Sequence, residues 1–140
     1  MNSLDDLYDF ADGEGIEVFA FSLPSVGSLS TMDSSGACYI GIDPFVLKNG
    51  RDETVRLAHE LGHCVTGSFY NIYATCDIRA KHERAADKWA IKKLVPEDEL
   101  KRAIDQGLTE PWELSEYFDV TLPFIKKAME FYREQALSRM

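Results

Sequence analysis

Long apolar runs are the first thing that this sequence of 140 residues lacks. No stretch approaches the roughly 18 consecutive apolar residues that identify a membrane-spanning helix. Residues 1–12 are acidic, whereas a secretory signal begins with basic residues that are followed by apolar ones. We therefore expect a cytoplasmic protein that does not interact with a membrane.

Cysteine is also scarce. The three cysteines, Cys38, Cys64 and Cys76, are an odd number and have no CxxC spacing. This pattern suggests neither a disulfide framework nor a cysteine zinc site. We expect all three to be free thiols, with Cys64 packed in the core.

Cations are few relative to anions. The chain has 15 Lys and Arg against 24 Asp and Glu, which gives a net charge of -9. Non-specific binding to nucleic acid depends on Lys and Arg neutralising phosphates. The composition therefore disfavours direct binding to nucleic acid and is better suited to a neutral or basic protein partner.

What the sequence does contain is an HELGH pentapeptide at 59–63. If residues 51–68 form a helix, His59 and His63 project from one face about 40° apart, so the two imidazoles can share a metal. Glu60 is rotated from His59 by about 100°. It is poorly placed as a ligand from the same turn, but it can reach a water molecule held on that metal.

A catalytic zinc site uses three protein ligands and keeps one position open for water. The best third ligand is Glu83, twenty residues after His63 in a stretch, 81–90, that predicts a second helix. Asp87 lies one turn further along the same face. Ligating histidines usually donate their other ring N–H to a carboxylate or carbonyl, so Asp87 could orient His59 or His63.

Each of these pieces alone would be an ordinary polar or acidic helix face, and only their combination indicates a metal site. His, His and Glu also accept other divalent ions, but zinc is the expected one. Zinc lowers the pKa of its bound water to about 7, so Glu60 could act as base in amide hydrolysis. Tyr70, Tyr73 and His82 are candidates for stabilising the resulting oxyanion, and the sequence does not choose among them.

The remaining pattern predicts an α+β domain, mostly helical and with a small antiparallel sheet before the helix that carries the pentapeptide. We expect a helix over 3–11, a strand over 16–21, a loop over 25–36 and a second strand over 37–42, antiparallel to the first. The second strand is a candidate edge for binding an extended peptide, or it is only scaffold.

The C-terminal part is predicted to be helical. One helix covers 97–106, and two more, within 112–139, are separated by a turn at 119–121. The pair resembles a helix-turn-helix, but its balanced charge favours a helical hairpin that covers the core. We expect one domain over 1–140, in which 1–50 holds the first helix and the strands, 51–95 the metal-binding helices, and 96–140 the C-terminal helices.

Three segments, HELGHCVTGSFYN at 59–71, ERAADKWA at 83–90 and KKLVP at 92–96, resemble the ImmA/IrrE family of metallopeptidases. The resemblance implies a zincin-like fold in which His59, His63 and Glu83 hold zinc. It implies that Glu60 is the catalytic base. Members of that family commonly have Asn where Asp87 stands, and Asp can accept the same hydrogen bond.

The resemblance also implies a biological role. Small members of the family, encoded by prophages and integrative elements, are anti-repressors that cleave a helix-turn-helix repressor. We therefore expect a zinc endopeptidase that cleaves the repressor of its own mobile element. Three alternatives remain open: a non-catalytic, metal-containing protein-binding module, a DNA-binding regulator that uses the C-terminal helices, and a toxin-antitoxin component.

Overall fold

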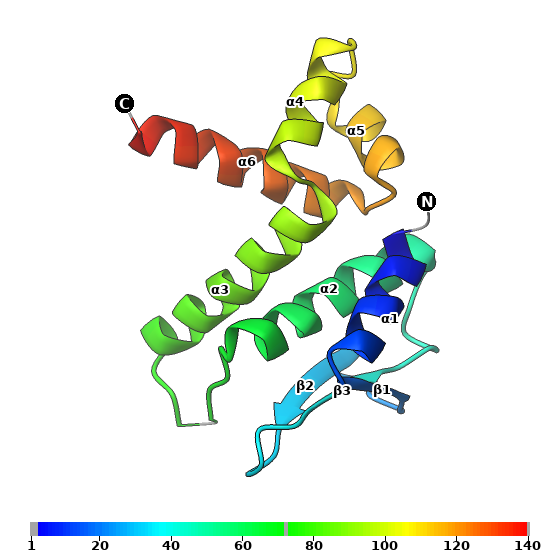
Figure 1. The fold of residues 1–140 in the computed structure, drawn as a ribbon, viewed down its shortest axis with the longest axis vertical. Helices are drawn as coiled ribbons and strands as arrows, with labels where there is room; N and C mark the ends of the chain where they lie inside the picture. Colours follow the sequence, from blue (N-terminus) through cyan, green and yellow to red (C-terminus); the bar gives the residue numbers. More distant parts are fainter. Residues whose placement is uncertain (1–2, 72, 140) are drawn as a thin grey trace.

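The fold is α+β, as predicted (Figure 1). The computed structural model describes residues 3–71 and 73–139. Within these ranges the elements, in chain order, are α1 (Ser3–Gly13), β1 (Glu17–Ala20), β2 (Ser28–Met32), β3 (Cys38–Ile42), α2 (Gly50–Thr66), α3 (Cys76–Leu94), α4 (Glu97–Asp105), α5 (Pro111–Phe118) and α6 (Leu122–Ser138).

The three strands form one mixed sheet in the order β1-β3-β2. β1 pairs with β3 in parallel, from Glu17 opposite Tyr39 to Ala20 opposite Ile42. The predicted antiparallel pairing of these two strands is therefore wrong. A third strand lies between them in sequence, so the chain returns to β3 in the direction of β1.

That third strand, β2, lies where the sequence predicted a loop over 25–36. It pairs antiparallel with β3, and Asp33 closes the turn between them by accepting hydrogen bonds from the backbone N–H groups of Ser35 and Ala37, at 2.9 and 3.0 Å. The inward side chains of β2 are the hydroxyls of Ser28 and Ser30, which contact a buried carboxylate. Polar residues on the inner face concealed the alternation of apolar and polar residues that identifies a strand.

Helix α2 is the centre of the molecule, with the sheet and α1 on one side and α3 on the other (Figure 1). Its Leu57, Ala58 and Leu61 are fully buried. Against them pack Leu7 of α1 and Ile40 of β3, with the other core residues. The helix that carries the pentapeptide is thus fixed by the core on both sides.

The C-terminal helices form a second group of packed elements beyond α3. Phe118 of α5 and Ile125 of α6 are buried in the same core. The Tyr132 hydroxyl donates to the carbonyl of Val95 at 2.7 Å. Between α5 and α6, Asp119 adopts a left-handed conformation with φ of 55°. The pair covers the core, as expected for a helical hairpin.

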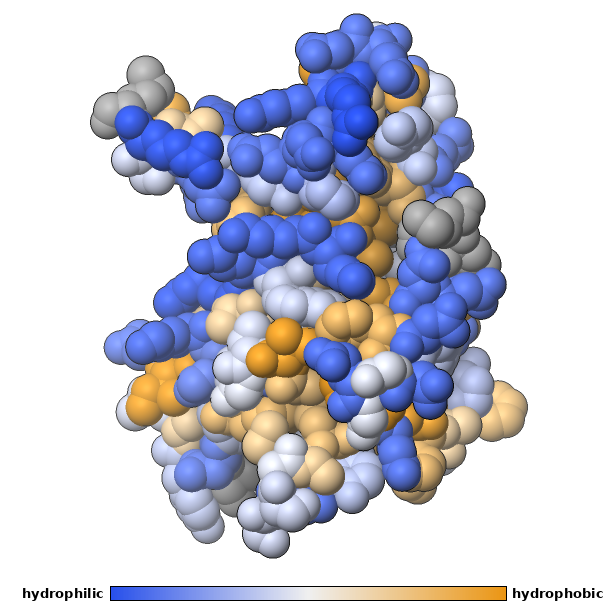
Figure 2. Space-filling model, in the orientation of Figure 1, coloured by the Kyte–Doolittle hydropathy of each residue, from blue (hydrophilic) through white to orange (hydrophobic). Residues whose placement is uncertain are grey.

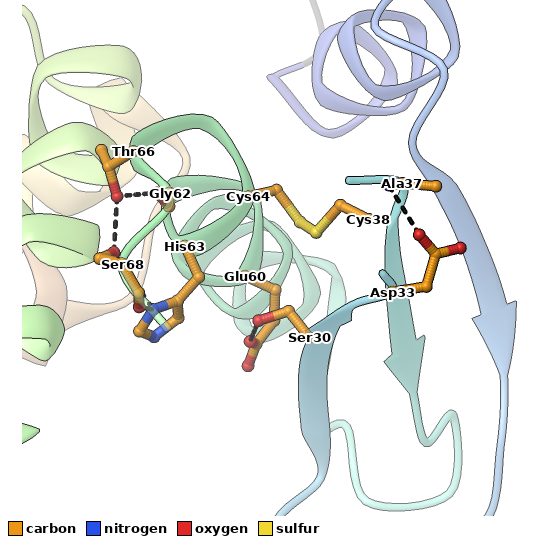
Figure 3. The surroundings of a disulfide bond; sticks show 10 residues. All are labelled: Ser30, Asp33, Ala37, Cys38, Glu60, Gly62, His63, Cys64, Thr66 and Ser68. Atoms are coloured by element: carbon orange, nitrogen blue, oxygen red, sulfur yellow. Dashed lines mark hydrogen bonds between the residues drawn. A yellow bond between two sulfur atoms is a disulfide. The ribbon is translucent and has the colours of Figure 1, made fainter. Parts of the chain in front are cut away.

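Two of the three cysteines are not free thiols. Cys38 of β3 and Cys64 of α2 form a disulfide, with their Cα atoms 5.9 Å apart (Figure 3). Cys76 is free, as expected, and it is exposed. A single bridge between residues 26 apart leaves no spacing signal in the sequence, because it depends on the sheet packing against α2.

Hydrophilic side chains gather on the upper, helical part of the molecule, and apolar or weakly polar ones are more frequent on the lower part (Figure 2). On the N-terminal part, Phe19, Phe21, Leu29 and Phe45 are each at least 40% exposed. Among the described helices, none has the length and apolar character needed to cross a membrane. On the face that Figure 2 shows, apolar surface is therefore more frequent over the lower part, which includes the sheet.

Candidate metal centre

Three predicted ligands converge from two helices. His59 and His63 of α2 place their Nε2 atoms 3.2 Å apart. The Glu83 carboxylate of α3 lies 2.8 Å from Nε2 of His59 and 3.2 Å from Nε2 of His63. One ligand atom from each residue lies within 4.8 Å of the others, a grouping that could hold a metal ion.

Gly62 explains how α3 comes close enough to supply Glu83. A Cβ atom at Gly62 would lie 2.4 Å from the backbone oxygen of Ala86, far closer than such atoms approach. Ala86 is three residues after Glu83, so the helices touch almost one turn from the carboxylate. A side chain at position 62 would push Glu83 away from the histidines.

The backbone holds the ring of His63. Its Nδ1 lies 2.6 Å from the carbonyl oxygen of Ser68, and since a carbonyl only accepts, Nδ1 carries the proton. This leaves the Nε2 lone pair facing Glu83. Gly67, with φ of 66°, ends α2 and turns the chain back so that Ser68 reaches the ring (Figure 3). The sequence predicts a helix over 51–68 but contains no signal that assigns Ser68 this role.

A carboxylate holds the ring of His59. Its Nδ1 lies 2.8 Å from Oδ1 of Asp87, so of the two histidines it is His59 that Asp87 orients. The other oxygen of Asp87 accepts from Nζ of Lys127 on α6 at 3.2 Å. Both imidazoles therefore have Nδ1 engaged and Nε2 available, which is the arrangement that metal-ligating histidines need.

The same contacts shift two pKa values in the metal-free protein. Burial of the His59 ring alone would lower its pKa, but the hydrogen bond to Asp87 and the nearby carboxylate charges outweigh burial and raise it. Burial alone would raise the pKa of Asp87, but its contacts with His59 and Lys127 outweigh burial and lower it. When His59 is protonated, it and Asp87 therefore stabilise each other as an ion pair.

Glu60 lies beside the ligands and is only 7% exposed. One carboxylate oxygen accepts a hydrogen bond from the hydroxyl of Ser30 at 2.7 Å (Figure 3). The other accepts from the hydroxyl of Ser28 at 2.9 Å. Both serines belong to β2, the strand that was not predicted. The two serines on alternate residues were the only signal in the sequence that could have identified these donors.

A cavity of about 270 Å³ opens onto these groups. Its walls include all three candidate ligands and Glu60, with β2 on one side and the segment after α2 on the other. The lining residues are Ser28, Leu29, Ser30, His59, Glu60, His63, Ser68, Phe69, Tyr70 and Glu83. The cavity therefore gives access both to the candidate metal ligands and to the Glu60 carboxylate.

Of the three candidates for oxyanion stabilisation, the structure places only Tyr70 in this cavity. Its hydroxyl donates to Oε1 of Glu83 at 2.8 Å, and this hydrogen bond raises the pKa of Tyr70. The ring of His82 stacks on that of Tyr70, with centroids 6.2 Å apart. Tyr73 is 87% exposed and does not line the cavity.

Comparisons with family models, with curated proteins and with solved structures give no match. Membership of the ImmA/IrrE family therefore stays a prediction from the sequence motifs. The observed architecture is α+β with a mixed sheet, and the His59, His63 and Glu83 cluster is a possible site for a metal ion whose identity the protein geometry does not determine.

Proposed function

We propose that this protein is a zinc-dependent endopeptidase. One observation carries the proposal: two imidazole Nε2 atoms and a carboxylate converge in a cavity whose wall also holds the buried Glu60 carboxylate. The donor set suits zinc, since both rings are fixed through Nδ1 and Glu83 completes three protein ligands. A bound zinc ion would supply a water of lowered pKa and polarise the scissile carbonyl.

Glu60 is the general base in this proposal. It takes a proton from the attacking water and delivers it to the amine that leaves, as one carboxylate can do in both steps. The hydroxyls of Ser28 and Ser30 hold its two oxygens toward the cavity. Strand β2 would therefore orient the base as well as form one wall of the cavity.

The substrate is proposed to be an extended peptide that adds to β2. The predicted accepting edge, residues 37–42, is wrong, because β3 is the central strand and pairs on both sides. Within the described residues no strand pairs with the outer edge of β2, and β2 lines the cavity. A strand edge beside a catalytic centre can bind a peptide by main-chain hydrogen bonds.

The proposed biological substrate is a helix-turn-helix repressor of the same mobile element, cleaved in the cytoplasm. Two things support this choice: the motif resemblance, and a net charge of -9, which favours association with a basic DNA-binding protein. The protein would then act as an anti-repressor. A non-catalytic module that grips the same repressor is the alternative that an experiment must separate.

The test is Glu60→Gln, a change that keeps the shape and removes the base. We expect zinc content equal to wild type, measured by elemental analysis, and a cleavage rate lower by about 10²- to 10⁴-fold, the usual contribution of a general base. Cleavage is measured by mass spectrometry on a peptide library and on candidate repressor proteins. Glu99→Gln, on the exposed face of α4, is the matched control. Release of the repressor from DNA by Glu60→Gln without any cleavage would favour the binding module, and unchanged cleavage would overturn Glu60 as the base.

A further inference from the structure

Lys127 contacts the metal centre from the far end of the sequence. It lies on α6, forty residues after Asp87, and its Nζ is 3.2 Å from Oδ2 of that carboxylate. Oδ1 of the same carboxylate lies 2.8 Å from Nδ1 of His59. The two oxygens of Asp87 are thus held by donors from two other helices, α2 and α6.

We propose that Lys127 is a positioning residue of the metal centre. By holding Oδ2, it fixes the plane of the Asp87 carboxylate so that Oδ1 stays directed at His59. The orientation of His59 decides where its Nε2 points, and therefore how well it serves as a ligand. The inference rests on the proposed metal centre and adds helix α6 to it.

The surroundings of Asp87 show why a second anchor is needed. The Asp87 side chain is 27% exposed, so water can compete for its oxygens. It borders a second cavity of about 300 Å³, whose walls include His59, Glu83, Phe124 and Lys127. A single hydrogen bond from His59 leaves the carboxylate able to rotate into this space, whereas the second bond from Lys127 restrains it.

The ion pair between Lys127 and Asp87 is expected to contribute little to the free energy of unfolding. A positioning role can therefore be distinguished from a structural role by experiment. Lys127 is 54% exposed, and ion pairs between groups as accessible as this one have small effects on stability. Loss of the charge should therefore leave the fold intact. Substitution of a partner that directly orients a ligand typically costs 10- to 100-fold in metal affinity. Lys127 acts one step further away, so a loss of about threefold to tenfold is expected.

The test compares Lys127→Met with Lys126→Met, both measured in the full chain. Lys126 is the adjacent exposed lysine and lines a groove beside α4 instead. Zinc affinity is measured by competition with a chromophoric chelator, and ligand geometry by the visible spectrum of the Co²⁺-substituted protein. Lys127→Met should weaken zinc binding and alter the spectrum. Lys126→Met should do neither, and Lys127→Arg should restore most of the affinity.

A double-variant comparison tests whether Lys127 acts through Asp87. In an Asp87→Ala background, Lys127→Met should produce no further loss, because the group it positions is gone. An equal further loss there, unchanged affinity in Lys127→Met alone, or tighter zinc binding would overturn the positioning role. Zinc binding that depends on Lys127 without any peptide cleavage would overturn the proposed peptidase function only. Absence of zinc binding by the wild type would overturn the metal centre itself.

Discussion

At the scale of single residues, the two histidines differ in what fixes them. His63 is held by a backbone carbonyl, which no side-chain substitution at Ser68 removes. His59 is held by Asp87, a side chain that also bears a charge. The orientation of His59 is therefore the more sensitive of the two to mutation and to pH.

The raised pKa of His59 and the lowered pKa of Asp87 make a pH prediction for the metal-free protein. The stabilising contribution of His59 is full below its unfolded pKa and is lost as pH rises through its raised folded value. The contribution of Asp87 is full above its unfolded pKa and is lost as pH falls through its lowered value. The ion pair should therefore stabilise the fold most at mildly acidic pH.

The measurement is the thermal midpoint of wild type and Asp87→Asn across pH, with a chelator present. The stability lost in the variant should be largest at mildly acidic pH and should shrink above the pKa of His59. A difference that grows steadily toward alkaline pH would contradict the assigned pair. With zinc present, the stability of the wild type should instead rise with pH through the pKa of His59, since metal binding requires neutral His59.

At the scale of the elements, the helices and the strands β1 and β3 were predictable, whereas strand β2 and the pairing of the sheet were not. On the predicted helix over 51–68, the spacing of His59 and His63 identified the face that carries two candidate metal ligands. Glu83 was identified because a zinc site needs a third protein ligand. Strand β2 was not predicted because its inward residues, Ser28 and Ser30, are polar and hydrogen-bond to Glu60. The parallel pairing of β1 and β3 depends on β2, so the first omission caused the second.

Contacts between elements could not be predicted from residue spacing either, since they depend on tertiary packing. The Lys127 to Asp87 bond and the Ser68 carbonyl on His63 connect residues that no spacing rule relates. Gly62 is different, because a residue without a side chain in the fourth position of the pentapeptide permits close approach of another segment. The structure identifies that segment as the backbone of α3 at Ala86.

Gly62→Ala tests that close approach. The added Cβ would meet a backbone oxygen rather than a flexible side chain, so α2 and α3 must separate. We expect a loss of about 1 to 3 kcal/mol in the free energy of unfolding, typical of overpacking, measured by chemical denaturation. Zinc affinity should fall as well, because Glu83 moves with α3.

Gly50→Ala is the matched control for this change. Gly50 begins the same helix, and a Cβ there meets nothing within 4 Å. Its stability and zinc affinity should equal or slightly exceed those of the wild type, since alanine is the better helix former. Equal stability and equal zinc affinity of Gly62→Ala and Gly50→Ala would contradict the close contact between the α2 and α3 backbones.

At the scale of the whole molecule, the candidate centre lies where the N-terminal and C-terminal parts meet. The N-terminal part supplies the serines that hold Glu60, and the C-terminal part supplies Lys127, which holds Asp87. The helices α2 and α3, which lie between these two parts in sequence, carry the candidate ligands. Any change that loosens either part against α2 should therefore alter the site without touching a ligand.

The disulfide between Cys38 and Cys64 is the covalent link between the sheet and α2, and Cys64 directly follows His63. We expect the unreduced, unfolded chain to show one reactive thiol, that of Cys76, and the reduced chain to show three. Because the bond restricts the unfolded chain, reduction should lower the free energy of unfolding by roughly 2 to 4 kcal/mol. Cys76→Ser, which removes only the free thiol, should leave the unreduced protein as stable as the wild type.

Three thiols in the unreduced chain, or equal stability of both forms, would contradict the bond. The number of reactive thiols also tests the cellular compartment of the protein, since disulfides are rare in reducing compartments. A bond that persists in protein rapidly alkylated inside cells would argue against the proposed cytoplasmic site of action. Three thiols in cells and one after purification in air would be compatible with both the disulfide and a cytoplasmic site of action. Cys38 and Cys64 would then be reduced where the protein acts and would be oxidised by air only afterwards.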